Sequence, residues 1–183
     1  TKIDLLFNLV KKCDFIAIGG AMANTFLLAK NINVGKSLCE KELLGVSLNI
    51  IKKAKENNCK IILPIDAICA DDLTSQVNVV SCDINNIPSN KMILDVGTKT
   101  VQIISNYILK SKSILWNGPL GAFEYKPFEK SSLDIANFIM KNSKKLEISS
   151  IAGGGDTISV IKIANAQKGF SYISKAGGAF LEW

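Results

Sequence analysis

Residues 148–160, ISSIAGGGDTISV, are the stretch of the sequence best suited to chemistry. An apolar run ends at three consecutive glycines, residues 153–155, and Asp156 and Thr157 follow before apolar residues return at helical spacing. We predict a strand, a glycine turn and a helix start. Backbone N–H groups at such a start lack partners and lie at the positive end of the helix dipole, where glycines let a phosphate approach. Asp156 is placed to hold a hard cation that bridges phosphate oxygens.

The same turn also has a purely structural interpretation, a sharp connection in which Asp156 caps the helix. One glycine would be enough for such a connection, and each further glycine costs roughly 0.5–1 kcal/mol of chain entropy. We therefore favour an anion-binding turn over a structural one.

Composition excludes several other kinds of site. The sequence contains no histidine, which removes Ser-His-Asp triads, Cys-His pairs, histidine proton shuttles and nearly all zinc sites. It also contains no arginine, so bidentate guanine readout by arginine is impossible. Because the 22 lysines are dispersed, the net charge of +6 indicates a solvated surface and no nucleic-acid partner.

Length and residue usage set the broad class of the protein. The 183 residues are enough for one domain with a full core, and no apolar run is long enough to span a bilayer. The five cysteines form no C-x-x-C pair, and their odd number favours free thiols in a reducing compartment. We expect a soluble, cytoplasmic α/β monomer without a membrane partner. Since the chain begins at Thr1 and not at Met, we expect a fragment.

Short apolar runs and amphipathic stretches alternate along the chain, which predicts alternating strands and helices. The predicted strands are residues 14–20, 60–65, 77–82, 92–96, 113–116, 148–152 and 170–174. The predicted helices are residues 2–12, a helix through 25–28, then 40–55, 100–109, 131–140, one ending at 166 and one beginning at 179.

This alternation predicts a three-layer α/β sandwich in which a mostly parallel sheet of about six strands has helices on both faces. Glycine-bearing turns follow the strands that end before Gly20, Gly97, Gly118, Gly153 and Gly177. In an open parallel sheet the carboxyl ends of the strands share one edge, where ligands bind. We therefore expect these turns to gather in space.

The familiar phosphate-binding fingerprints are missing. There is no G-x-x-x-x-G-K-[ST] loop, and residues 19–24 do not form a G-x-G-x-x-G motif. No H-R-D or D-F-G element is present. These absences exclude a P-loop protein and a protein kinase, and they disfavour a nicotinamide-dependent dehydrogenase.

Five segments together resemble the phosphoglycerate kinase family. They are IGGAMANTF (18–26), LPIDAICAD (63–71), ILWNGPLGAFE (114–124), IAGGGDT (151–157) and YISKAGGAFLEW (172–183). The match covers the whole chain in order but corresponds to the C-terminal half of that enzyme. The resemblance implies that residues 1–183 are its Rossmann-like nucleotide-binding domain, and that the N-terminal phosphoglycerate-binding domain is absent.

The resemblance also implies an activity. Phosphoglycerate kinase is a transferase with a carboxyl group as acceptor, and it moves a phosphoryl group between 1,3-bisphosphoglycerate and ADP in glycolysis. It implies ADP or ATP as substrate, Mg²⁺ as cofactor and small molecules as partners, with the fragment alone inactive. Phosphoryl transfer needs positioning and charge stabilisation more than covalent chemistry by the protein, so it is compatible with the absence of histidine.

Individual residues match the family's positions. Asp156 matches the Mg²⁺ ligand, and Glu124 matches the acid that holds the ribose hydroxyls. Lys2 matches a lysine that reaches the phosphates, Gly155 lies in the turn that cradles them, and Gly177 falls in the last turn, which faces the transferred group. These three are the expected catalytic residues, and Gly155 is also an expected nucleotide-binding residue. The other expected nucleotide-binding residues are Gly20, Leu38, Gly97, Asn117, Pro119, Gly154 and Thr157.

Simpler interpretations stay open for these residues. Glu124 can be a solvated acid, Asn117 and Pro119 can belong to a plain turn, and Lys2 can be a surface charge. The chain as a whole can be a stand-alone adenine-nucleotide-binding module without catalysis. A nicotinamide-binding oxidoreductase is a more distant alternative.

Overall fold

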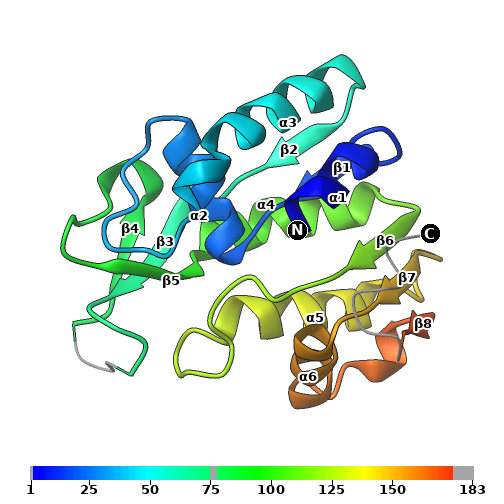
Figure 1. Cartoon of the computed structure of the whole chain (residues 1–183). Helices are drawn as coiled ribbons and strands as arrows, with labels where there is room; N and C mark the ends of the chain where they lie inside the picture. The colour runs from blue at the N-terminus through cyan, green and yellow to red at the C-terminus, as the bar shows by residue number, and fades with distance from the viewer. Residues whose placement is uncertain (1, 75–77, 175–183) are drawn as a thin grey trace. The chain divides into compact units, whose positions relative to one another are not determined.

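The computed structural model describes residues 2–74 and 78–174, without the side chains of Lys2 and Asp4. The chain divides into two compact units, Thr1–Thr100 and Val101–Trp183, whose elements are labelled in Figure 1. Among the described residues, no helix is both long enough and apolar enough to cross a membrane. The helix expected from residue 179 lies outside the described residues.

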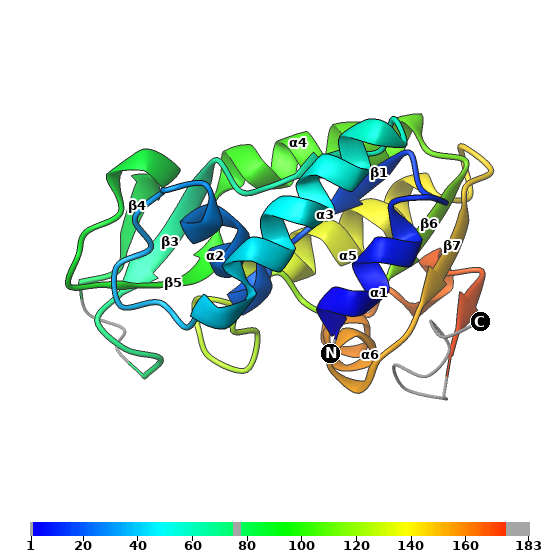
Figure 2. The ribbon, with the colours of Figure 1, turned by 45° about the horizontal axis from the view of Figure 1, so that its top comes forward.

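A parallel pair of strands and several helices form one part of the first unit. β1 (Phe15–Ala17) pairs in parallel with β2 (Lys60–Ile62). α3 contacts both α1 and α2, and Figure 2 shows α1 beside α3. Their apolar faces enclose a cluster that includes buried Phe26 and Ile50. The helical segments of this part are α1 (Lys2–Leu9), α2 (Gly20–Ala29), η1 (Lys41–Leu43) and α3 (Leu44–Glu56).

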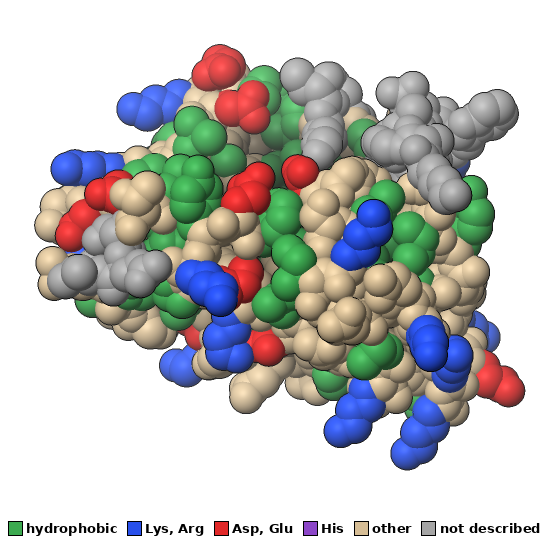
Figure 3. Space-filling model, turned by 90° about the horizontal axis from the view of Figure 1, so that it is seen from below, with side chains coloured by type: hydrophobic (Ala, Val, Ile, Leu, Met, Phe, Trp, Pro, Cys, Tyr) green, Lys and Arg blue, Asp and Glu red, His purple; other side chains and the backbone are tan. Residues whose placement is uncertain are grey.

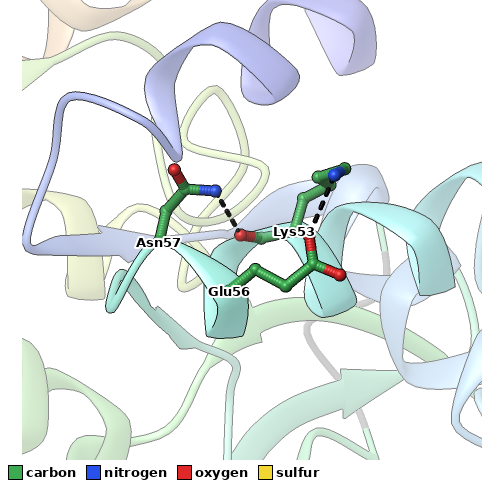
Figure 4. A network of polar contacts seen from close by, with 3 residues as sticks. All are labelled: Lys53, Glu56 and Asn57. Atoms are coloured by element: carbon green, nitrogen blue, oxygen red, sulfur yellow. Dashed lines mark hydrogen bonds and ion pairs between the residues drawn. The ribbon is translucent and has the colours of Figure 1, made fainter.

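The C-terminus of α3 closes with local polar contacts (Figure 4). Asn57 Nδ2 donates to the carbonyl oxygen of Lys53 at 2.8 Å, and Lys53 Nζ lies 2.8 Å from Glu56 Oε2. The hydrogen bond from Lys53, together with its charge, lowers the pKa of Glu56. Because all three side chains are exposed, the network contributes little beyond finishing the helix.

The rest of the first unit is an antiparallel sheet. β3 (Asp66–Ala70) lies between β4 (Val80–Asp83) and β5 (Met92–Val96), and both pairings are antiparallel. Between these strands the described chain has only the short 3-10 helix η2 (Ile84–Asn86). Antiparallel neighbours need no helical crossover, so short connections favour this arrangement.

The second unit is built on a parallel sheet in the order β6-β7-β8. These strands are β6 (Ser113–Trp116), β7 (Ser149–Ala152) and β8 (Tyr172–Ile173). The helical segments are α5 (Lys130–Asn142), α6 (Gly155–Ile163) and η3 (Gln167–Gly169), while α4 (Thr98–Lys110) begins in the first unit and continues into the second. α5 contacts α6 and η3. Phe128, Ile139 and Ile161 are fully buried in this unit.

The sheets differ from the single sheet of about six strands that the sequence predicts. The described strands form two parallel sheets and one antiparallel sheet. The mixed α/β class is confirmed, whereas the continuous, mostly parallel sheet is not observed. The sequence does not predict β3, because residues 66–70 directly follow the strand predicted over 60–65 and are buried on both faces without alternation.

Candidate functional site

In the second unit, the turns that follow β6 and β7 lie together. Trp116 pairs with Ala152, so both turns leave the sheet at the same edge. The Gly118 N–H donates to Thr157 Oγ1 at 2.6 Å, and the Gly153 N–H donates to the Trp116 carbonyl at 3.0 Å. The expectation that glycine-bearing turns gather is confirmed for these two turns.

Gly154 is required by the local fold. It is the N-cap residue of α6, and its φ of +90° is a conformation that residues with a Cβ rarely adopt. A Cβ at this position would also lie 2.6 Å from Asn117 Oδ1. The backbone of the glycine turn therefore packs closely against the half-buried Asn117.

Gly155, by contrast, is not required by the described structure. Its φ is not positive, no heavy atom of the described residues lies within 4 Å of a built Cβ, and the residue is exposed. Asp156 beside it is also exposed and belongs to the first turn of α6. No described side chain caps this helix start. Two exposed residues, one of them a glycine and the other a carboxylate, thus begin a helix without a side-chain cap, an arrangement suited to binding phosphate and a hard cation.

The other predicted residues of this unit lie around the same two turns. Thr157 is fully buried, and its hydroxyl ties the turns together by accepting from Gly118. Pro119 is half-buried, and the next residue, Leu120, donates its N–H to Ser132 Oγ of α5 at 2.9 Å. Glu124 is exposed further along this loop. The observed role of Thr157 is to hold the turns in place, a function that the sequence analysis did not assign.

In the first unit, Gly20 begins α2, and Leu38 lies in the irregular segment that follows this helix. Gly20 is the first residue of the helix, is exposed and has a φ of +61°. Asn24 Nδ2 donates to the Leu38 carbonyl at 3.1 Å, and the Glu40 N–H donates to Thr25 Oγ1 at 3.0 Å. These bonds hold the segment around residue 38 against α2, while the Leu38 side chain is 70% exposed.

Gly97 packs against Asp66, a residue to which the sequence analysis assigned no role. The buried carboxylate accepts from the Lys99 N–H at 2.9 Å, and from the Thr100 N–H and Oγ1 at 2.8 and 2.6 Å. A Cβ at Gly97 would collide with this carboxylate. Asp66 therefore caps α4, and the N-terminus of α4 is not open to a phosphate.

Two predicted catalytic residues cannot be placed. Gly177 and the side chain of Lys2 lie outside the described part of the structure. Their roles stay predictions.

The first turn of α6 offers one carboxylate, that of Asp156, as a metal ligand. Within the described residues, no group of three or more cysteine, aspartate or glutamate side chains could hold a metal. A single exposed carboxylate nevertheless fits Mg²⁺, which proteins often bind through one or two carboxylates plus substrate phosphates. Asp156 therefore suits a metal that arrives together with a phosphate-bearing ligand.

Two other surface features, a hollow near the start of β7 and the distribution of lysines, are weaker candidates for a binding site. A hollow with a volume of about 380 Å³ lies near the start of β7 and is lined by Ser149 and Gly169, away from the turns at the strand end. The Gly169 carbonyl accepts hydrogen bonds from the buried hydroxyls of Ser143 and Ser150, so these polar groups already have partners within the protein. On the face drawn in Figure 3, lysine side chains form no single continuous patch.

The family model for phosphoglycerate kinase matches residues 1–183. The chain belongs to the phosphoglycerate kinase family. Two curated phosphoglycerate kinases, from Chelativorans sp. (strain BNC1) and Methylorubrum extorquens (strain PA1), are 46% and 47% identical to it over all 183 residues. The chain spans about half the length of these relatives, 46% in each case.

Solved phosphoglycerate kinase structures share the fold. The enzyme from Coxiella burnetii is 40% identical and superposes with a TM-score of 0.93 over 99% of this chain and 46% of its own. The enzyme from Pyrococcus horikoshii OT3 is 23% identical, with a TM-score of 0.79, and supports the fold alone. Membership of the family agrees with the resemblance seen in the sequence motifs.

Proposed function

We propose that residues 1–183 form the nucleotide-binding, C-terminal part of a phosphoglycerate kinase, which binds ADP or ATP with Mg²⁺. The whole protein transfers a phosphoryl group between 1,3-bisphosphoglycerate and ADP in glycolysis, in the cytoplasm and as a monomer. The observation that carries the proposal is Gly155, an exposed glycine at an uncapped helix start that the described fold does not require. A ligand that approaches the backbone supplies the missing reason for a glycine there.

We assign each residue at the start of α6 a separate role in binding the phosphates and the metal. The N–H groups of Gly155 and Asp156 donate to phosphate oxygens, and the helix dipole adds attraction. The Asp156 carboxylate holds Mg²⁺, which when bound stabilises negative charge on the phosphates. Gly154 and Thr157 keep these donors in place before the ligand arrives, which lowers the reorganisation needed for transfer.

Other residues complete the proposed site. Glu124 holds the ribose hydroxyls, and Asn117 and Pro119 shape the nucleotide-binding turn of the second unit. Gly20, Leu38 and Gly97 are proposed contacts of the first unit. Lys2, Gly155 and Gly177 are the proposed catalytic residues, all acting by charge and position. We expect residues 1–183 alone to bind nucleotide without turnover.

Titration calorimetry with MgADP tests the proposal on a matched pair of glycine variants. Gly155→Ala should weaken MgADP binding about tenfold or more, because a methyl group obstructs the backbone that the phosphate approaches. Gly45→Ala is the control: Gly45 is also an exposed glycine near a helix start, with no described heavy atom within 4 Å of a built Cβ. Both variants should gain up to about 1 kcal/mol of folding stability, but only Gly155→Ala should lose affinity.

A second variant separates the metal from the phosphate contacts. Asp156→Ala should weaken MgADP binding while changing the affinity for ADP in excess chelator much less. Equal MgADP affinities for the wild type, Asp156→Ala and Gly155→Ala would remove the α6 start from the site. Absence of MgADP binding by the wild-type chain would overturn the proposal for residues 1–183.

A further inference from the structure

Cys69 of β3 and Cys82 of β4 lie on the same face of the antiparallel sheet. Cys69 is opposite Val80, and Cys82 is opposite Ala67. Residues directly opposite each other, and residues two apart along a strand, share a face. The two cysteines are therefore diagonal neighbours, and both belong to the apolar cluster around Leu27.

Both cysteine side chains face the same apolar cluster. Cys69 is fully buried, whereas Cys82 is half-buried. The pKa of Cys69 is raised to about 12, mainly by its burial and secondly by the neighbouring Cys82. Cys69 is therefore a neutral thiol near pH 7 and a poor nucleophile alone, and Cys82 is the member of the pair that a reagent reaches first.

Their diagonal placement disfavours a direct disulfide. The Cα atoms of diagonal neighbours in an antiparallel pair are typically about 7–8 Å apart. The Cα atoms of two disulfide-bonded cysteines are usually no more than about 6.8 Å apart. A disulfide would thus need the backbone to move. A single atom placed between the sulfurs needs less movement, and thiolates prefer soft acceptor atoms.

We propose that Cys69 and Cys82 form a two-thiol site that takes one soft acceptor atom between the sulfurs, supplied by a trivalent organoarsenical. The arsenic forms two As–S bonds, both thiols lose their protons, and the arsenical oxygen leaves as water. Arsenic stays trivalent, so neither oxidant nor reductant is consumed. Cys82 forms the first bond, and the second bond to Cys69 is then intramolecular.

The position of β4 gives a reagent access to this site. β4 is an edge strand whose only described partner is β3. Edge strands separate locally more readily than central strands, which exposes Cys69 briefly after Cys82 has reacted. Cys39 packs against the same cluster, but no described group of three cysteines could hold one metal, so the site has two ligands.

The test uses phenylarsine oxide as the probe, at one equivalent per chain. Intact mass should increase by one phenylarsine oxide less one water, and thiols titrated in denaturant should fall from five to three. The adduct should survive excess monothiol and be removed by a dithiol. Cys82→Ser and Cys69→Ala should each lower the apparent affinity by about 10²–10⁴-fold, since the second bond is no longer intramolecular.

Cys13→Ser is the matched control. Cys13 and Cys59 are also neighbours. The pKa of Cys59 is raised to about 11, mainly by burial and secondly by the nearby Cys13. Cys13→Ser breaks that second pair and should keep the full affinity for the probe. The proposal fails if Cys82→Ser binds as tightly as the wild type, or if only Cys13→Ser loses the adduct. It also fails if oxidised glutathione closes a Cys69–Cys82 disulfide as readily as the probe binds.

Discussion

Glycines at strand ends are present for different physical reasons, and only the structure separates them. Gly154 is set by its positive φ and by Asn117, and Gly97 by the adjacent carboxylate of Asp66. Gly155 has neither reason within the described residues. A glycine that the fold does not need is therefore a stronger indication of a ligand than the number of glycines in a motif.

Asp66 gives a prediction at this scale. Asp66→Asn should lower the free energy of unfolding by about 1–3 kcal/mol, because an amide can no longer accept from both Lys99 and Thr100 and leaves a buried donor unpaired. Urea denaturation at pH 7 measures the change. Asp83→Asn is the control, since Asp83 is an exposed cap that accepts from the Asn85 N–H at 2.9 Å. Equal losses in the two variants would contradict the capping role of Asp66.

At the scale of elements, the sequence predicts well wherever hydrophobic periodicity is clear. β6 was predicted with the observed bounds, and α4 and α5 to within two residues at each end. Periodicity failed at β3, a short strand buried on both faces beside a proline. It also cannot show a side chain that crosses between elements, and so it missed the Asp66 cap of α4. The glycine turn was found because its signal is local.

The ion pair between Lys91 and Asp71 joins the end of β3 to the start of β5. Lys91 Nζ lies 3.0 Å from Asp71 Oδ1 and 2.9 Å from the Asn78 carbonyl. The hydrogen bond from Lys91 lowers the pKa of Asp71. Because the pKa of Asp71 is lower in the folded state than in the unfolded state, ionised Asp71 stabilises the fold at any pH above its unfolded-state pKa of about 3.9. This contribution is lost as the pH falls through the folded-state pKa.

Asp71→Asn should therefore lower the unfolding midpoint at pH 7, and the gap to the wild type should narrow as the pH falls below about 3.9. Thermal melts of both proteins at several pH values measure this. The loss at neutral pH arises mainly because the buried Lys91 keeps its charge but loses its carboxylate partner. A gap that is constant from pH 7 to pH 3 would show that the ion pair does not contribute.

At the scale of the whole molecule, the absence of histidine sets how stability depends on pH. Stability changes with pH only where the folded and unfolded states bind different numbers of protons. Carboxylates titrate near 4 and lysines near 10, and the described cysteines with shifted pKa values are shifted upward. The side chains of this protein therefore have little to titrate between about pH 5.5 and 7.

The unfolding midpoint should accordingly stay constant, within scan error, from about pH 5.5 to 7 in the absence of nucleotide. Added MgADP should raise the midpoint by mass action, and any pH dependence of that increase must come from the phosphates of the ligand. Thermal melts with and without MgADP measure both quantities. A midpoint that shifts by more than scan error over this range without nucleotide would contradict the prediction.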